Sequence, residues 1–253
     1  MPSSTFTKIR LGIVCPMANE RDNAVDFVRA VLGVCRSFSF QEIQFFTIFD
    51  RVCTDGTCDL LRDSARQIPE LRVVYAEENR SVVDAYMRGY REAILSECDW
   101  ILEIDAGFSH QPEDIPLFFA TMAEGYDSVF GSRFIKGARF TETPLKRYLI
   151  SRGGSLLTNW FLGTRLKDMA SGFELFTREA LAAILRRGIH SRGPFFQTEI
   201  RTFAHDFKIK EVPIHYRAGN HPVSNKTLQD AFTHLKRLRR MRKEGTLWRN
   251  NPA

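Results

Sequence analysis

The sequence predicts a single α/β domain with a mostly parallel central sheet and helices on both faces. Two observations favour this fold. Short apolar runs alternate with segments of helical periodicity through the first half of the chain, and polar residues directly follow each apolar run. Repeated strand–helix–strand units of this kind build parallel sheets. A length of 253 residues with 43% hydrophobic residues is ample for one packed core.

The first half contains five apolar runs that predict strands and four amphipathic segments that predict the helices between them. The strands are expected at Leu11 to Cys15, Ile43 to Phe49, Leu71 to Tyr75, Trp100 to Ile104 and Ser128 to Phe130. The helices are expected at Asp22 to Arg36, Thr57 to Gln67, Val82 to Leu95 and Glu113 to Glu124.

The second half is less regular and has no internal repeat or low-complexity linker. It predicts a helix from about Leu145 to Phe161, a strand near Phe173 to Phe176, helices near Arg178 to Arg186 and Phe196 to Ala204, and a strand from Ile209 to His215.

Several classes of protein are disfavoured by the composition. No window reaches the roughly 18 uninterrupted apolar residues that a membrane-spanning helix needs. The first apolar run leads into Asn19 and Glu20 without a small-residue cleavage site, so it is typical of a strand and not of a signal peptide. The five cysteines are scattered and contain no C-x-x-C pair, which favours a reducing cytoplasm and disfavours a zinc site.

The net charge of +6 comes from one segment, Lys236 to Lys243, which holds six of the 36 basic residues and no acid. Leu235, Leu238 and Met241 would give a helix there a narrow apolar edge. We therefore expect the main α/β domain over 1–228 and a basic amphipathic C-terminal helix or tail over 229–253. This helix is either simply solvated or attached to an anionic membrane surface; without a recognised motif elsewhere, no nucleic-acid partner is expected.

Polar residues follow all five predicted strands of the first half. They lie in Pro16 to Glu20, Asp50 to Thr57, Asn79 to Asp84, Asp105 to His110 and Gly131 to Arg133. Because the strands are parallel, these loops meet at one edge of the sheet, where α/β proteins bind ligands. A nucleotide diphosphate needs acceptors for its base and ribose and cations for its phosphates, and these loops offer both.

In this order, the segments resemble the motifs of family 2 glycosyltransferases of the GT-A fold, and of the dolichol- or polyprenyl-phosphate mannosyltransferase branch in particular. The family's P-x-x-N-E, D-D-G-S-x-D-G-T and D-A-D-x-S-H-x-P motifs match the segments that begin at Pro16, Asp50 and Asp105. Later matches are Gly131 to Arg133, Arg147 with Ile150 to Gly153, Asp168 to Phe173, Phe196 to Glu199 and Glu211 to Ile214. The resemblance runs from about Leu11 to Leu228 and implies a Rossmann-like GT-A domain.

The resemblance also implies a role for each matching residue. The backbone of Pro16, together with Glu20 and Asp50, would hold the nucleoside, and Asp105 would lie beside the ribose and the diphosphate. An acid in the first turn of the following helix is the structural alternative for Glu20. Phosphate charge, which guanidinium groups bind bidentately, would be held by Arg133 and Arg147 with Ser151.

The implied reaction is inverting transfer of a hexose from a nucleotide sugar, GDP-mannose by default or a UDP-hexose, to a polyprenyl or dolichol phosphate. A lipid phosphate is already anionic near neutral pH, whereas a hydroxyl acceptor needs a general base, for which Glu199 and Asp168 are the candidates. For both acids the alternative is a buried pair with an arginine. Two other functions stay open, namely a transferase with a soluble or protein acceptor and a catalytically silent nucleotide-binding subunit.

Two departures from the family motifs concern metal binding. Gly107 stands at the second acidic position of D-A-D, which leaves Asp105 as the motif's carboxylate ligand for Mg²⁺ or Mn²⁺. Arg51 replaces the second aspartate of D-D-G-S. The resulting hypothesis is that fixed cations supply part or all of the charge of the metal; these are Arg51, Arg133, Arg147 and Lys226.

Two further loops bear on specificity. The segment Asn79 to Asp84 carries Val82 and Val83 where the family often has a glycine-rich turn, so donor or acceptor specificity is expected to differ. The segment Gly219 to Lys226 resembles the family's mobile basic loop, from which Lys226 or His221 would reach the donor phosphate on closure. An ordinary surface loop is the alternative for this segment.

Overall fold

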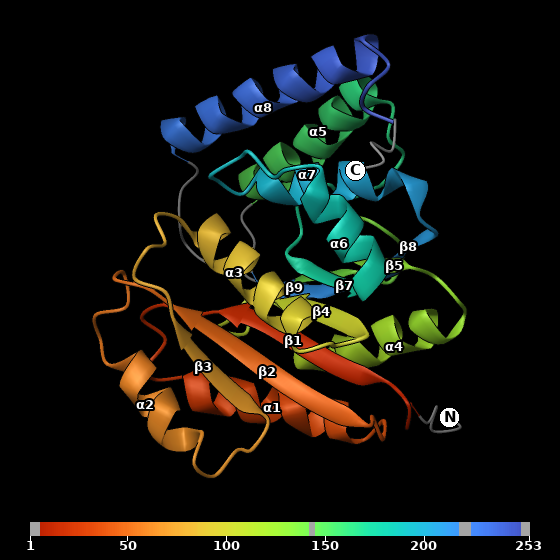
Figure 1. Cartoon of the computed structure of the whole chain (residues 1–253). Coiled ribbons are helices and arrows are strands. Elements are labelled where there is room, and N and C mark those ends of the chain that lie inside the picture. Colours follow the sequence, from red (N-terminus) through yellow and green to blue (C-terminus); the bar gives the residue numbers. More distant parts are fainter. Residues whose placement is uncertain (1–5, 142–144, 218–223, 249–253) are drawn as a thin grey trace.

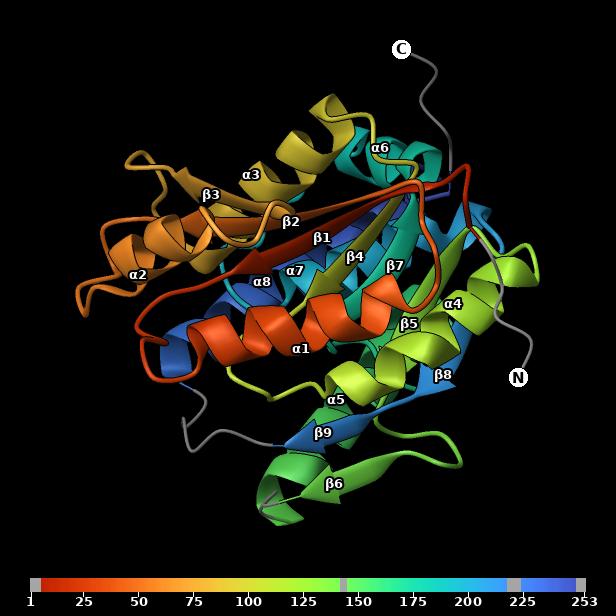
Figure 2. The same ribbon diagram turned by 90° about the horizontal axis from the view of Figure 1, so that it is seen from below.

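The sheet at the centre of the molecule has seven strands in the order β3-β2-β1-β4-β7-β5-β8 (Figures 1 and 2). The computed structural model describes residues 6–141, 145–217 and 224–248, without the side chains of Lys146 and Arg147. The strands are β1 (Arg10–Pro16), β2 (Glu42–Phe49), β3 (Leu71–Tyr75), β4 (Trp100–Ile104), β5 (Ser128–Ser132), β7 (Phe173–Thr177) and β8 (Ile209–Pro213).

The sheet is parallel except for β7. β1 pairs in parallel with β2 and β4, and β2 with β3. β7 lies antiparallel between β4 and β5, so β5 and its parallel partner β8 point the same way as β4. All five strands expected in the first half are confirmed within one or two residues at each end. The sequence did not indicate that a later, antiparallel strand separates β4 from β5.

Helices cover both faces of the sheet, as expected (Figure 1). Side chains of α1 (Ala24–Arg36), α2 (Thr57–Ser64) and α4 (Ile115–Ala123) share one apolar core cluster, and those of α3 (Val82–Leu95), α6 (Arg178–Arg186) and α7 (Phe196–Phe203) share the cluster on the other face. The Ser81 hydroxyl accepts a hydrogen bond from the N–H of Asp84 and so fixes the start of α3.

The segment expected as one strand from Ile209 to His215 forms two strands. After β8, whose last residue is Pro213, the chain leaves the central sheet, and β9 (His215–Arg217) pairs in parallel with β6 (Arg139–Thr141). A proline has no N–H to donate to a ladder, which explains why the ladder ends there. The small β6–β9 sheet is visible beside the main sheet in Figure 2.

The last helix, α8 (Asn225–Lys243), runs alongside α5 (Leu145–Leu162) on the outside of the α7 layer (Figure 1). The boundary expected after residue 228 falls inside α8. The apolar edge expected for this helix faces the protein, because Leu235 and Leu238 are buried and Met241 packs against the same core cluster. No helix in the described part of the chain is both long and apolar enough to span a membrane.

Candidate active site

The sequence-predicted site residues that follow β1, β2, β4 and β5 lie at one edge of the sheet. Pro16 is the last residue of β1, and Asp50, Asp105 and Arg133 directly follow β2, β4 and β5. β1 is hydrogen-bonded to β2 on one side and to β4 on the other. The loops after these three strands are therefore neighbours, whereas β7 separates Arg133 from Asp105.

Asp105 is held in place by groups from two directions. The Tyr86 hydroxyl, from the inner face of α3, donates a hydrogen bond to Oδ1 of Asp105, and Nδ1 of His110 lies 3.5 Å from Oδ2. A Cβ atom added to Gly172 would lie 2.9 Å from Oδ1, so a side chain there would push the carboxylate away from its present position. The Asp105 side chain is 40% exposed, which leaves it accessible to a ligand.

A row of rings links Asp105 with Arg133. The His110 ring packs 5.4 Å from the Tyr216 ring, and the guanidinium carbon of Arg133 lies 5.1 Å from the centroid of Tyr216. Burial lowers the pKa of His110 to about 4, so the imidazole is neutral at neutral pH. His110 therefore adds no positive charge beside Asp105.

Arg133 and Asp168, two of the residues expected to act on substrate, are paired with each other. Nε and Nη2 of Arg133 donate to the two carboxylate oxygens of Asp168 at 2.7 and 2.8 Å, and the Arg133 backbone N–H adds a third bond. Asp168 is fully buried and Arg133 is 8% exposed. This carboxylate is not placed to take a proton from an acceptor, and the guanidinium offers little surface to a phosphate.

Glu199, the other candidate base, is also buried and engaged. Its Oε2 accepts hydrogen bonds from the backbone N–H groups of His190 and Ser191, both at 2.9 Å, and its Oε1 accepts from Nη2 of Arg237 at 2.5 Å. The contact with Arg237 ties α7 to α8. The arrangement matches the alternative weighed for this acid, a buried pair with an arginine.

A buried polar cluster lies beneath the site. Glu103 and Glu174 are register partners on β4 and β7, and both are fully buried. Arg201 donates to Glu174 at 2.7 Å, whereas Glu103 receives hydrogen bonds from the Tyr90 hydroxyl and the Gln197 amide. Burial, reinforced by the charge of Glu174, raises the pKa of Glu103 well above its usual range. Of the two acids, Glu174 is the one that pairs with a cation, Arg201.

The loops after β1 and β2 support each other. The backbone N–H of Glu20 donates to the Thr57 hydroxyl at 3.0 Å, and a carboxylate oxygen of Asp50 accepts from the N–H of Val52. Arg51, one of the four fixed cations of the metal-replacement hypothesis, is exposed and forms an ion pair with Glu77 at 2.7 Å. Two of the four cations, Arg51 and Arg133, are therefore already paired with carboxylates.

The remaining candidates belong to α5 and α8. Ser151 is half-buried on α5, and Lys226 is exposed in the first turn of α8. Arg147 is part of α5, but its side chain lies outside the described residues, as does all of His221.

Among the described residues, no three His, Cys, Asp or Glu side chains converge to hold a metal ion. A cation would need substrate oxygens to complete its shell, as Mg²⁺ commonly does with one or two carboxylates and the substrate phosphates. The accessible carboxylate of Asp105 fits such a site.

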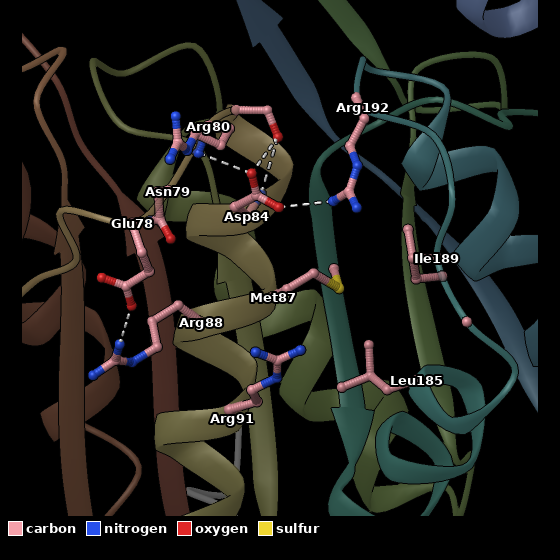
Figure 3. Close-up of a pocket in the computed structure, with 12 residues that line it drawn as sticks. Glu78, Asn79, Arg80, Asp84, Met87, Arg88, Arg91, Leu185, Ile189 and Arg192 are labelled. Atoms are coloured by element: carbon pink, nitrogen blue, oxygen red, sulfur yellow. Dashed lines mark hydrogen bonds and ion pairs between the residues drawn. The ribbon is translucent and has the colours of Figure 1, made fainter.

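The described residues also line a cavity of about 630 Å³ between α3 and the segment Leu185 to Arg192 (Figure 3). Asp84, Met87 and Arg91 of α3 face it, and Arg192 forms an ion pair of 2.7 Å with Asp84. Its lining includes Asn79, Arg80, Ser81 and Asp84 of the predicted specificity loop, but neither Tyr86 nor Asp105.

Sequence reasoning missed the residues that support the site from below. Tyr86 and Tyr90 lie one turn apart on α3. They contact Asp105, which directly follows β4, and Glu103 near the end of that strand. The i, i+4 spacing of two tyrosines on the inner face of a helix was a usable signal. Nothing local marks Arg201 as fully buried, since its partners come from two distant segments, around Gly131 and from Asp168 to Glu174.

Comparisons with known proteins agree with the resemblance found in the sequence. The family model described as "Glycosyl transferase family 2" matches residues 12–192. The chain is 32% identical over 169 residues to the undecaprenyl-phosphate mannosyltransferase of Micrococcus luteus, covering 66% of this chain and 69% of that protein. It is 25% identical over 237 residues to the polyprenol monophosphomannose synthase of Mycolicibacterium smegmatis, covering 91% and 87%.

Among solved structures, glucosyl-3-phosphoglycerate synthase from Mycobacterium tuberculosis is similar in fold. Its complex with Mn²⁺, UDP-glucose and phosphoglyceric acid gives a TM-score of 0.63 at 15% identity, covering 90% of this chain and 80% of that chain. The GT-A fold expected from the sequence is thereby confirmed. Because the family model also matches well over half of the sequence, this chain belongs to glycosyltransferase family 2.

Proposed function

We propose that this enzyme transfers a hexose, with mannose as the first candidate, from a nucleotide diphosphate sugar to a polyprenyl or dolichol phosphate. An oxygen of the acceptor phosphate attacks the anomeric carbon and forms the new C–O bond while the bond to the donor diphosphate breaks. The nucleoside diphosphate leaves with the electron pair, and the configuration at the anomeric carbon inverts. The names of the two mannosyltransferase relatives support this choice of substrates.

The choice of acceptor rests on the burial and pairing of the two candidate bases. Glu199 and Asp168 are fully buried, and each is paired with an arginine. A hydroxyl acceptor would need one of them as a base, whereas a phosphate monoester is anionic near neutral pH and attacks without one. A phosphate acceptor is therefore favoured over a soluble or protein hydroxyl.

The donor is proposed to lie across the ends of β1, β2 and β4. The Pro16 backbone and Asp50 would hold the nucleoside, with Asp105 next to the ribose and the diphosphate. Lys226 and Arg147 are the cations proposed for phosphate, because Arg51 and Arg133 already have acidic partners. GDP-mannose is the proposed donor and a UDP-hexose the alternative, given the UDP-glucose in the complex of the structural neighbour.

The acceptor's lipid tail calls for a membrane surface, and α5 with α8 offers one. Leu145, Leu149, Leu156 and Trp160 recur along a single stripe of α5 and are 57–73% exposed. The neighbouring helix α8 adds the basic run Lys236 to Lys243. Anionic lipid attracts such a run by about 1 kcal/mol per basic residue near the surface, while the apolar stripe enters the interface.

We place this surface on the cytoplasmic side of the membrane. Cys15, Cys35, Cys53, Cys58 and Cys98 are all free thiols. Free thiols throughout a chain are typical of a reducing compartment.

The acceptor assignment is tested by supplying labelled GDP-mannose, or UDP-glucose in parallel, with polyprenyl phosphate in detergent micelles. We expect a labelled lipid that migrates as a sugar phosphodiester. The matched control is the polyprenol of the same length without its phosphate, which should yield no product because the two candidate bases, Glu199 and Asp168, are buried and paired with arginines. Turnover with the alcohol but not with the phosphate would reverse the assignment, and absence of transfer with either donor would favour the silent-subunit alternative.

The membrane assignment predicts that substitutions in the exposed stripe release the protein from vesicles. Leu149→Gln with Trp160→Gln should lower binding to vesicles containing phosphatidylglycerol at least about tenfold, since each buried apolar side chain contributes about 1.5–3 kcal/mol. Leu95→Gln is the matched control, because Leu95 is 78% exposed at the end of α3. Co-sedimentation with the vesicles measures the effect. Equal binding of the native protein, the double variant and Leu95→Gln would contradict a membrane contact of α5.

A further inference from the structure

The space that a side chain at residue 107 would fill is occupied by another carboxylate. Gly107 has a φ of +74°, and a Cβ atom added there would lie 3.0 Å from both Oε1 and Oε2 of Glu20. Glu20 belongs to the loop after β1, the strand that pairs with β4. Residue 107 is acidic in the D-A-D motif of the family. Here it is a glycine, and the neighbouring carboxylate comes from Glu20 in the loop after β1.

The Glu20 carboxylate has no basic partner. Among the residues that the structure describes, no hydrogen bond or ion pair reaches its carboxylate oxygens, although its backbone N–H and C=O are both engaged. The adjacent Arg21 points elsewhere, because its Nη1 donates to the carbonyl of Asp55 at 3.0 Å.

Asp105 likewise pairs with no lysine or arginine in the described structure. Its two polar neighbours there are the Tyr86 hydroxyl and the His110 imidazole. The loops that carry these two carboxylates are neighbours, because they follow β1 and β4, which pair in parallel. Hard divalent cations prefer oxygen ligands and are commonly bound by one or two carboxylates together with substrate phosphates.

We propose that Glu20 supplies the carboxylate that Gly107 lacks, so that Asp105 and Glu20 together hold Mg²⁺ or Mn²⁺ against the diphosphate of the donor. The inference rests on the proposed function, since the donor supplies the remaining oxygen ligands. It gives Glu20 a role different from nucleoside binding, and it makes replacement of the metal by fixed arginines unnecessary.

The proposal predicts a selective loss of metal affinity in Glu20→Gln, which keeps the size of the side chain and removes its charge. Mn²⁺ binding, measured by the electron paramagnetic resonance signal of free Mn²⁺ at saturating GDP or UDP, should weaken at least about tenfold. Calorimetric affinity for the nucleotide without metal should stay within about twofold. Asp22→Asn, an exposed acid two residues along, is the matched control and should change neither value.

Relocation of the carboxylate provides the decisive comparison. Adding Gly107→Asp to Glu20→Ala, which empties the space beside residue 107, should restore Mn²⁺ affinity to within about threefold of the native value, since aspartate tolerates the left-handed backbone better than most residues. Gly107→Asp alone should not tighten binding, because two carboxylates would then compete for one space.

Three results would overturn the inference. Unchanged Mn²⁺ affinity in Glu20→Gln would remove Glu20 from the metal site. An equal loss of nucleotide affinity with and without metal would assign Glu20 to the nucleoside. A double variant that folds, as judged by circular dichroism, but binds no more Mn²⁺ than Glu20→Gln would show that position 107 does not face the metal. Failure of the native protein to bind any nucleotide would instead contradict the proposed function itself.

Discussion

Replacing Asp105 by asparagine is expected to lower the rate of sugar transfer by about 10²- to 10³-fold while leaving the fold intact. The variant keeps the size of the side chain and still accepts the hydrogen bond from Tyr86. It loses the negative charge at the end of β4, where the diphosphate and its cation are proposed to lie. Electrostatic groups that act on the departing charge commonly contribute factors of this size.

The measurement is kcat for transfer from the nucleotide sugar, with thermal unfolding as a check on the fold. Asp59→Asn is the matched control, because Asp59 is 79% exposed on α2 and pairs only with Arg62 of the same helix. A variant at Asp105 that retains more than about a tenth of the native rate would contradict a central role for this carboxylate.

Replacing Arg133 by alanine is expected to reduce the free energy of unfolding by about 3–5 kcal/mol, because it leaves Asp168 as an unpaired charge in the interior. Burial by itself would raise the pKa of Asp168, but the Arg133 guanidinium outweighs this effect and lowers the pKa to about 2. Urea denaturation at neutral pH measures the loss. Arg51→Ala is the control and should cost at most about 1 kcal/mol, since its partner Glu77 is 65% exposed.

Two additions separate loss of the pair from loss of packing. Arg133→Met combined with Asp168→Asn should recover part of the stability, because no unpaired charge is then buried. The folded pKa of Asp168 also lies below the unfolded value of about 3.9, so the pair stabilises the native protein fully above about pH 4 and less as the pH falls toward 2. An Arg133→Ala protein as stable as Arg51→Ala would contradict the buried pair.

The two predictions separate residues that looked alike in the sequence. Asp105 and Asp168 both stand in polar motifs, but Asp105 is 40% exposed while Asp168 is fully buried. Loss of Asp105 should therefore affect catalysis with little effect on folding, and loss of the Arg133–Asp168 pair should affect folding first.

Most of the secondary structure could be predicted from the sequence because periodicity is a local property. Runs such as Leu71 to Tyr75 and Val82 to Leu95 match β3 and α3 residue for residue. The alternation of strands and helices then determined the parallel order of the first strands and the edge at which their loops meet. The insertion of β7 between β4 and β5 was not predictable, because strand neighbours in a sheet depend on packing between segments far apart in the chain.

The motifs likewise placed Pro16, Asp50 and Asp105 at one edge of the sheet, and with them the family. What the sequence by itself determined was therefore the order of elements and the side chains delivered to the strand ends. Only the tertiary structure decided which charges pair, namely Arg133 with Asp168 and Arg237 with Glu199. It also decided that the Glu20 carboxylate lies where a side chain of residue 107 would be. The physical reason is that local periodicity sets the direction of a side chain, whereas the partner of a buried charge comes from another part of the chain and is fixed by close packing.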